Sequence, residues 1–266
     1  MLPSGKGGIG VVGLVVLLLV GCSTTEAVAR VQITVGPSVG AAFNNLQDAV
    51  AAATTSASPV SIVVQAGQYN HTHNCGLVVN ASLGIRFVGA GTDVTVIDCA
   101  HANRFVTVEV DPSVPAAVWG SIEGMTVRRG AAVDGGEGGA ILIQPTSGAA
   151  AGGVAQLELT DVVVVDSHAN STSVSGFNTA SGGGGVAILR VANVVMQGVT
   201  IDGCTSSTHG GAMTVSHASN ITLRGGEMRQ STTQQYGGCL EIGFSNSLVV
   251  EDVVFTGCTT VSSSNG

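Results

Sequence analysis

Ser121-Ile122-Glu123-Gly124-Met125-Thr126-Val127 is the stretch that decides the fold, because its pattern returns four more times along the chain. Successive copies are offset by 37, 37, 27 and 27 residues, and each offset holds across the whole segment. Aligning the copies gives two apolar columns: Ile122, Leu159, Met196, Leu223 and Val250, and Val127, Val164, Ile201, Met228 and Phe255. Polar residues alternate with these apolar ones, as in a strand with one buried face. The repeat therefore predicts stacked strands whose apolar columns point into a shared core.

A second strand in each repeat opens with a pair of glycines. The pairs that we align are Gly138-Gly139, Gly184-Gly185, Gly210-Gly211 and Gly237-Gly238. Glycine permits the positive φ or the close backbone approach that a sharp corner requires. A coil of 27 residues cannot bury its apolar face alone, so neighbouring coils must stack. We therefore expect an all-β, right-handed parallel β-helix over residues 61–266.

The segment before the repeats has a different pattern. Phe43, Leu46, Val50 and Ala53 have helical spacing, which predicts a short amphipathic helix over the open end of the coil. Residues 30–60 are accordingly expected to form an N-terminal cap. At the other end, Ser264-Asn265-Gly266 stands where the next glycine pair would begin, so we expect the stack to be truncated at its C-terminus.

Residues 1–29 have the features of an export signal. Lys6 precedes an apolar run from Ile9 to Val20, which is too short to span a bilayer of about 30 Å. Two types of export signal are consistent with this segment. Ala27-Val28-Ala29 fits a cleavage site of a signal peptide, whereas Leu19-Val20-Gly21-Cys22 resembles a lipoprotein box with Cys22 as the lipidated residue. We expect a mature chain without a transmembrane span, secreted or at the cell surface, with an outer-membrane lipoprotein as the alternative.

Charge excludes one class of partner. The chain has nine Lys and Arg residues, which are scattered, and a net charge of −8. Nucleic-acid binding requires clustered basic residues, so we expect no nucleic-acid partner.

Export makes disulfides and glycans relevant. Cys75 and Cys99 are 24 residues apart, close to one coil, which predicts a disulfide between adjacent coils. Cys204, Cys239 and Cys258 are expected to be buried, inert thiols. If the source is eukaryotic, glycans are expected at four sequons, Asn70, Asn80, Asn170 and Asn220.

Several motifs together resemble a known group. Leu46-Gln47-x-Ala49-Val50, Ile62-x-Val64-x-x-Gly67-x-Tyr69, Val88-Gly89-Ala90-Gly91 and Thr95-Val96-Ile97 resemble the opening of pectin-lyase-like β-helix proteins. The glycine pairs are similar to the repeats of chlamydial polymorphic membrane proteins, although Cys258 stands where their F-x-x-N element would place Asn. The resemblance covers residues 43–266 and implies the fold. It does not imply an activity, because the superfamily includes lyases, hydrolases, adhesins and structural proteins.

Charged residues near the first full coil are the candidates for catalysis. They are Asp111, Glu123, Arg128, Arg129, Asp134 and Glu137. A polysaccharide lyase could use an Arg base beside acid-bound Ca²⁺, whereas loop charges of a scaffold are simply solvated. Asp134-Gly135-Gly136-Glu137 is either a Ca²⁺ ligand set or a solvated turn. No other cofactor is expected.

Two further patterns have a structural interpretation beside a functional one. His71, His73 and Cys75 alternate, as three metal ligands on one side of a strand would, or else form a polar loop with a disulfide cysteine. In the regular columns opposite charges stack, Arg224 over Glu251 and Asp202 over Arg229, which predicts surface ion pairs.

These observations favour an exported, non-catalytic β-helix that serves as an adhesin-like or binding scaffold for carbohydrate or a cell-surface protein. The alternative is a polysaccharide lyase or glycoside hydrolase acting on acidic polysaccharide. A third hypothesis is the passenger segment of an autotransporter.

Overall fold

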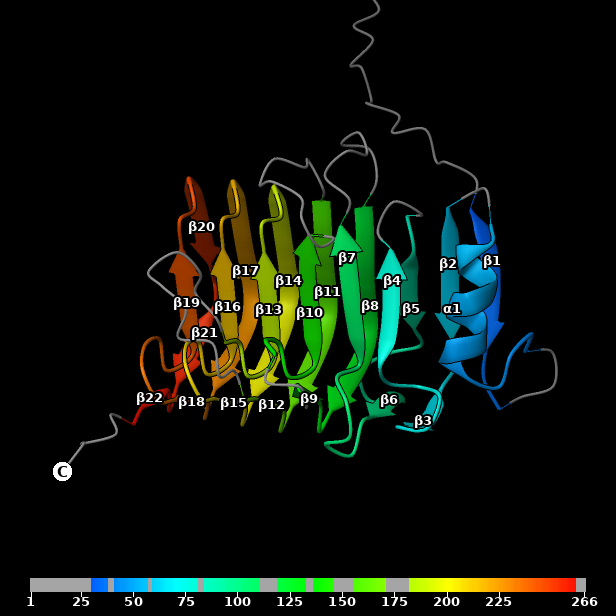
Figure 1. Ribbon diagram of the computed structural model, residues 1–266, viewed down its shortest axis with the longest axis horizontal. Coiled ribbons are helices and arrows are strands. Elements are labelled where there is room, and N and C mark those ends of the chain that lie inside the picture. The colour runs from blue at the N-terminus through cyan, green and yellow to red at the C-terminus, as the bar shows by residue number, and fades with distance from the viewer. Residues whose placement is uncertain are drawn as a thin grey trace, which may run out of the picture.

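The computed structural model describes residues 30–37, 41–56, 59–80, 84–110, 119–132, 136–145, 156–170 and 182–261. Almost all regular structure in these ranges is β, arranged in three parallel sheets that run side by side along one long axis (Figure 1). No helix in the described ranges is long and apolar enough to cross a bilayer.

The 11-stranded sheet contains β1 (Val31–Val35), β2 (Val60–Val64), β3 (Gly67–Asn70), β5 (Arg86–Gly89), β6 (Thr95–Asp98), β8 (Trp119–Arg128), β11 (Gln156–Val165), β14 (Asn193–Asp202), β17 (Asn220–Arg229), β20 (Ser247–Glu251) and β21 (Val254–Thr256). The 6-stranded sheet contains β4 (Leu77–Asn80), β7 (Val106–Val110), β10 (Ile141–Pro145), β13 (Val186–Leu189), β16 (Met213–Ser216) and β19 (Leu240–Gly243). The 5-stranded sheet contains β9 (Ala131–Ala132), β12 (His168–Ala169), β15 (Thr205–Ser206), β18 (Thr232–Thr233) and β22 (Thr259–Thr260).

Each later coil visits all three sheets in turn. β11 is followed by β12 and then β13, and each of these strands pairs in parallel with its counterpart in the next coil. Each coil therefore satisfies its backbone hydrogen bonds through its neighbours, and the fold is an all-β solenoid of stacked parallel coils.

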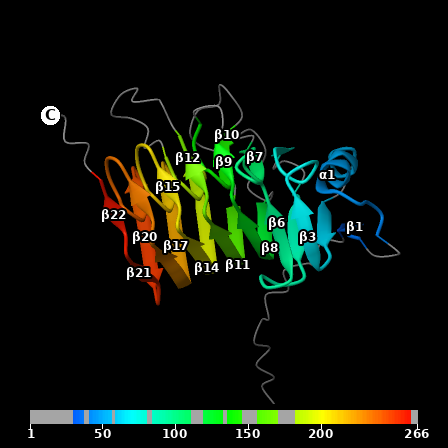
Figure 2. The same cartoon turned by 90° about the horizontal axis from the view of Figure 1, so that it is seen from below.

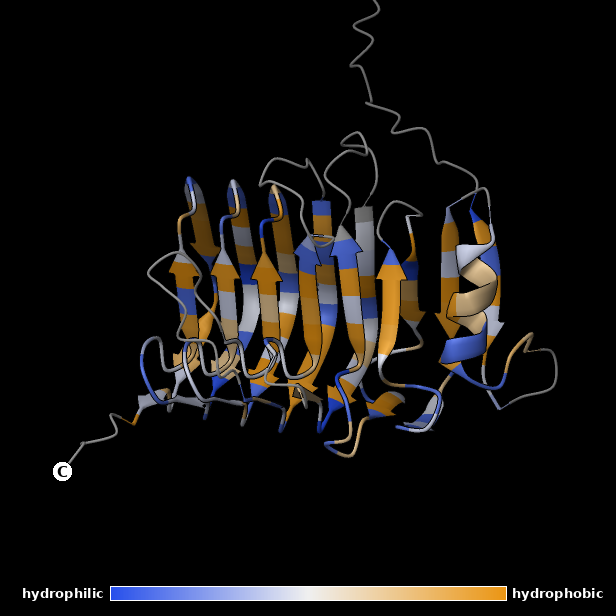
Figure 3. Ribbon diagram, in the orientation of Figure 1, coloured by the Kyte–Doolittle hydropathy of each residue, from blue (hydrophilic) through white to orange (hydrophobic). Residues whose placement is uncertain are grey.

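The strand register confirms the alignment of the long repeat. Ile122 lies opposite Leu159, which lies opposite Met196 and then Leu223, all at most 2% exposed. Apolar and polar bands alternate along the strands in Figure 3 as period-2 burial requires. In the last described coil the column ends at Val250, which is 42% exposed because no further described coil covers it.

Each long strand bends sharply at one position of the repeat, and this bend restricts which residues can occupy that position. Gly124, Asp161, Gly198, Gly225 and Asp252 share that position, and all five have φ between 49° and 62°. Glycine and Asp are among the residues that enter this left-handed region most readily. The position therefore holds Gly or Asp in each of these five copies, and the backbone turns at the equivalent residue of every copy.

The solenoid begins earlier than the sequence predicts. β1 pairs in parallel with β2, so the sheet starts at Val31 rather than at residue 61. The predicted helix is present as α1 (Leu46–Thr54), whose side chains at Leu46, Ala49, Val50 and Ala53 are buried. It contacts β1, β2 and β4, and lies beside β1 in both views (Figures 1 and 2). Residues 30–60 thus contribute a strand of the sheet as well as this helix.

One glycine pair is shifted by a residue. Ile141 lies opposite Val186, so Gly185 falls in the column of Ala140, and the pair that matches Gly138-Gly139 is Gly183-Gly184. The φ of Gly183 is +74°, close to the +66° of Gly138. Four consecutive glycines made the alignment ambiguous, and the backbone conformation selects the register.

The structure contains two disulfides. Cys75 and Cys99 are joined with a Cα–Cα distance of 5.7 Å, as their spacing predicted. The prediction of inert thiols at Cys239 and Cys258 was wrong, since these two are also bonded, with a Cα–Cα distance of 5.1 Å. Cys239 directly precedes β19 and Cys258 lies between β21 and β22, so the bond closes a segment with a sequence separation of 19 residues, shorter than one 27-residue coil. Only Cys204 remains a buried free thiol among the described cysteines.

The geometry of the Cys239–Cys258 disulfide indicates where a further disulfide could be engineered. Gly185 precedes Cys204 by 19 residues, the separation of Cys239 and Cys258, and a Cβ at Gly185 would lie 3.2 Å from the Cys204 sulfur. We expect Gly185→Cys to bond to Cys204 and to raise the free energy of unfolding by about 1 to 3 kcal/mol through loop closure. The lower end of this range allows for crowding, because the new Cβ would lie only 2.9 Å from the Ile201 side chain.

Burial raises the pKa of the Cys204 thiol to about 12, so the bond should form during folding rather than in the folded protein. Mass spectrometry after alkylation, with and without dithiothreitol, measures the bond. The same variant with Cys204→Ser is the control, and two alkylated thiols in Gly185→Cys would contradict the prediction.

Candidate functional site

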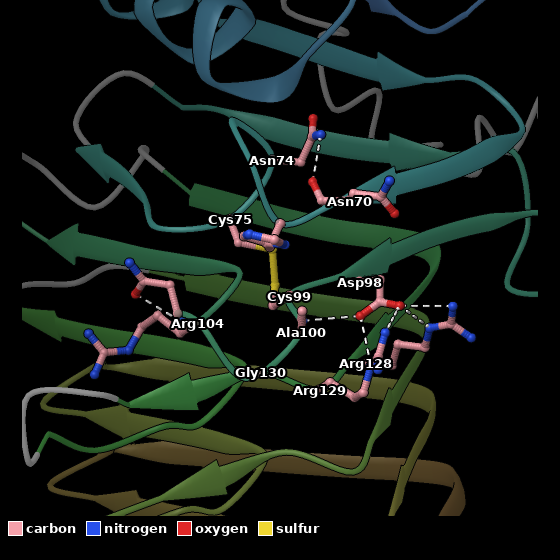
Figure 4. Close-up of a disulfide and its surroundings, with 12 residues drawn as sticks. Asn70, Asn74, Cys75, Asp98, Cys99, Ala100, Arg104, Arg128, Arg129 and Gly130 are labelled. Carbon is pink, nitrogen blue, oxygen red and sulfur yellow. Dashed lines mark hydrogen bonds and ion pairs between the residues drawn. A yellow bond between two sulfur atoms is a disulfide. The ribbon is translucent and has the colours of Figure 1, made fainter.

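Asp98 lies at the centre of a group of charged side chains that includes two predicted site residues (Figure 4). It ends β6, opposite Arg128 at the end of β8, and its side chain is only 6% exposed. The Arg128 Nε donates to Oδ2 at 2.9 Å, and the Arg129 Nε donates to Oδ1 at 2.9 Å. The backbone N–H of Ala100 adds a bond of 3.1 Å. Both predicted arginines therefore meet at one carboxylate from the preceding coil.

This arrangement fixes the charge state of the site. The hydrogen bond from Arg129 holds the pKa of the Asp98 carboxyl below its ordinary value, aided by Ala100 and Arg128 and opposed by burial. Asp98 raises the pKa of Arg129 in turn. Arg129 acting as a base would have to lose its proton, which its bond to Asp98 disfavours. The Asp98 cluster, defined as Asp98, Arg128 and Arg129, is suited to joining coils.

The disulfide strengthens the same junction. Cys99 directly follows Asp98 and is fully buried, while Cys75 belongs to the coil before (Figure 4). Asp98 was not among the residues predicted for the site, because the early coils differ in length and the constant offsets do not reach them. Its place at the end of the strand Thr95–Asp98 was the available signal.

Glu123 is occupied by a different partner. It forms an ion pair with Arg86 of the neighbouring strand β5, and the two side chains are 24% and 34% exposed. Glu123 and Arg128 lie on the same strand but pair with two different residues of the preceding coil, Arg86 and Asp98. The structure therefore does not bring the predicted acid and base together.

Glu137 lies apart from these residues. It is near Arg104, a buried arginine that donates to the backbone oxygens of Glu137 and Gly138 at 3.1 and 3.2 Å. Burial raises the pKa of Glu137 to about 7, although the Arg104 charge opposes the rise. Glu137 is thus the predicted site residue whose protonation changes near neutral pH.

This pKa predicts a pH-dependent effect of Glu137→Gln. The folded state keeps the proton up to about pH 7 and the ordinary value is 4.5, so stability contributed by the protonated form is lost as pH rises through this interval. The free energy of unfolding of the wild type should therefore fall between pH 5 and pH 8, and that of Glu137→Gln should not show this fall. The difference between variant and wild type should shift in favour of the variant by about 1 to 3 kcal/mol from pH 5 to pH 8. Urea unfolding at the two pH values measures this difference, and an equal effect at both would contradict it.

Asp111, Asp134 and Cys22 lie outside the described residues. The Ca²⁺ and lipidation hypotheses that rest on them therefore stay predictions.

The predicted ion pairs of the later coils are present. Arg224 Nε lies 2.8 Å from Glu251 Oε2, and Arg229 Nε lies 3.0 Å from Asp202 Oδ2. Arg229 also reaches Glu227 of its own strand at 3.2 Å. Charges on this sheet face thus bind neighbouring coils, as in the Asp98 cluster.

His71 and His73 do not lie on an extended strand. Residues 71–76 form turns, His73 has φ 64°, and Cys75 is in the disulfide. The His73 ring lies 3.0 Å from the Gln47 side chain of α1. Residues 71–76 therefore form a polar loop that contains a disulfide cysteine. Within the described ranges, no three His, Cys, Asp or Glu side chains already form a metal-binding group.

The four sequons differ in exposure. Asn70, Asn170 and Asn220 are exposed, and Asn80 is partly buried. Asn220 donates to the Asn193 side chain of the previous coil at 2.8 Å. Glycosylation itself remains a prediction.

Comparison with models of protein families gives no match, and a search of curated proteins likewise finds no relative.

Proposed function

We propose that this chain is an exported, non-catalytic scaffold that presents a binding surface outside the cytoplasm, as an adhesin-like protein does. One observation carries the proposal: the described candidates for catalysis at Glu123, Arg128 and Arg129 are paired with residues of neighbouring coils. Charges used in this way stabilise a stack and leave no free acid and base side by side at these positions.

The finer description of the fold belongs to the same proposal. We infer a right-handed parallel β-helix of the pectin-lyase-like type, with repeats related to those of chlamydial polymorphic membrane proteins and with α1 as the N-terminal cap. The stacked parallel coils and the buried face of α1 support it. Export through residues 1–29 fits the two disulfides, since such bonds persist in oxidising compartments. Surface display, a lipoprotein anchor and an autotransporter passenger are the forms that export could take.

The ligand that we expect is carbohydrate or a cell-surface protein. The competing function is a lyase or hydrolase of acidic polysaccharide, and one experiment separates them. The purified chain is incubated with pectate or alginate, with and without Ca²⁺, while absorbance of unsaturated products and reducing ends are measured. We expect no turnover from a chain whose circular dichroism shows an intact β-fold. Turnover that disappears in Arg128→Lys or Arg129→Lys would overturn the scaffold proposal.

Binding is measured separately. The chain is co-sedimented with insoluble polysaccharides and applied to cell surfaces, with a heat-unfolded sample as the control. Retention of the folded chain alone supports the binding function, and equal retention of both samples contradicts it.

A further inference from the structure

Two histidines and an aspartate converge at a corner of the solenoid that no predicted site included. His101 lies shortly after β6, Asp166 directly follows β11, and His168 begins β12. His101 Nε2 is 3.5 Å from Asp166 Oδ2, and the His101 and His168 rings have centroids 5.0 Å apart with a tilt of 38°.

The coil between them explains why these side chains meet. His101 comes from one coil, and Asp166 and His168 come from the second coil after it, so their backbones are about 9.6 Å apart at two spacings of roughly 4.8 Å. The intervening coil has Gly130 and Ala131 at this corner, with Ala131 in register with His168. Ala131 has a short side chain at this corner, and the longer His101 and Asp166 side chains meet across the intervening coil.

The separations are those of ligands that share one ion. Two donor atoms about 2.0 to 2.1 Å from a tetrahedral metal are roughly 3.3 Å apart, and two imidazoles bound to it have centroids roughly 5 Å apart. His101 and Asp166 therefore already have near-ligand spacing. A turn of the His168 ring about its side-chain bonds is the remaining adjustment that a complete ligand set requires.

We propose that His101, Asp166 and His168 bind a single transition-metal ion such as Zn²⁺ or Ni²⁺, with water completing its coordination. Two imidazoles and one carboxylate suit these ions, whereas Ca²⁺ and Mg²⁺ prefer sets made of oxygen ligands. The site goes beyond the proposed scaffold function and does not depend on it, since it would link three consecutive coils whatever the ligand of the protein is.

Charge and exposure around the site both bear on cation binding. The Asp98 carboxylate offsets one of the two guanidinium charges of Arg128 and Arg129, and the Arg129 charge also acts on Asp166. The Asp166 side chain is 63% exposed, so an ion can enter from solvent. His101 and Asp166 have φ of 56° and 49°, so both project from sharp corners of the backbone.

Isothermal titration of the full chain with Zn²⁺ and with Ni²⁺ tests the proposal. We expect one ion per chain with an affinity on the order of micromolar, and a loss of about tenfold or more in Asp166→Asn and in His168→Gln. His217→Gln is the matched control, because His217 stacks on Phe244 at a different corner. Ca²⁺ should give no comparable binding.

Three results would overturn the proposal. The first is the absence of saturable binding by the wild type, and the second is unchanged binding by Asp166→Asn and His168→Gln. The third is loss of binding in His73→Gln, which would place the ion in the loop of residues 71–76. Circular dichroism of each variant shows whether it is folded. A Zn²⁺-dependent rise in melting temperature that vanishes with Asp166→Asn gives a second readout.

Discussion

Replacing Asp98 by Asn should lower the free energy of unfolding by about 2 to 4 kcal/mol, since it leaves two guanidinium groups facing each other without their carboxylate. The Asp98 side chain is 6% exposed, whereas Arg128 and Arg129 are 40% and 44% exposed, so water partly screens the arginines. This screening keeps the expected loss below that of a fully buried pair. Urea denaturation at pH 7 measures the change.

The same carboxylate gives the wild type a defined acid sensitivity. Its pKa in the folded state lies below the ordinary 3.8, so its stabilisation is present above that value and is lost as pH falls from there towards the lowered pKa. Asp98→Asn should lack this component of the decline. If the variant and the wild type lose stability in parallel below pH 3.8, the Asp98 cluster does not act as described.

Two controls separate the cluster from ordinary surface charge. Arg224→Gln breaks a pair whose members are 58% and 54% exposed, and should cost at most about 1 kcal/mol. Adding Arg129→Gln to Asp98→Asn should recover part of the loss, because it removes one uncompensated guanidinium. A double variant less stable than Asp98→Asn would contradict the charge argument.

Gly226→Ala should be at least as damaging, with an expected loss of roughly 3 kcal/mol or more. Gly226 has φ of +90°, and a Cβ there would lie 2.1 Å from the Val199 oxygen of the preceding coil. Either a backbone shift or a broken coil contact must follow, since a carbonyl of a paired strand cannot yield as a flexible side chain does. Thermal and urea unfolding measure the effect.

The preceding residue provides a matched control. Gly225 has φ of +61°, but its nearest contact for a Cβ is the Gly198 nitrogen at 3.9 Å. Gly225→Ala should therefore cost only about 1 kcal/mol for the left-handed conformation, and Gly225→Asn less, since the same repeat position holds Asp161 and Asp252. Equal losses in Gly225→Ala and Gly226→Ala would show that steric contact between coils is unimportant here.

The sequence by itself determined the stacking. A strand exposes alternate residues to its two faces, and parallel coils keep equivalent residues opposite each other, so constant offsets along the chain become a register in space. The column from Ile122 to Val250 and the ion pairs Arg224–Glu251 and Arg229–Asp202 follow from that rule. The disulfide of Cys75 with Cys99 was predicted separately, from a spacing of 24 residues that is close to one coil.

Only the tertiary structure decided what depends on coil length, backbone conformation or side-chain reach. The early coils vary in length, so no column could assign Asp98 to Arg128 and Arg129. The run of glycines before Val186 aligns equally well in two registers, and only positive φ at Gly183 selects one. Cys239 and Cys258 belong to different repeat positions, and an alignment of equivalent residues does not show that these two positions come within 5.1 Å of each other. His101 meets Asp166 and His168 across an intervening coil, and an alignment of strands does not display a contact between corner residues two coils apart.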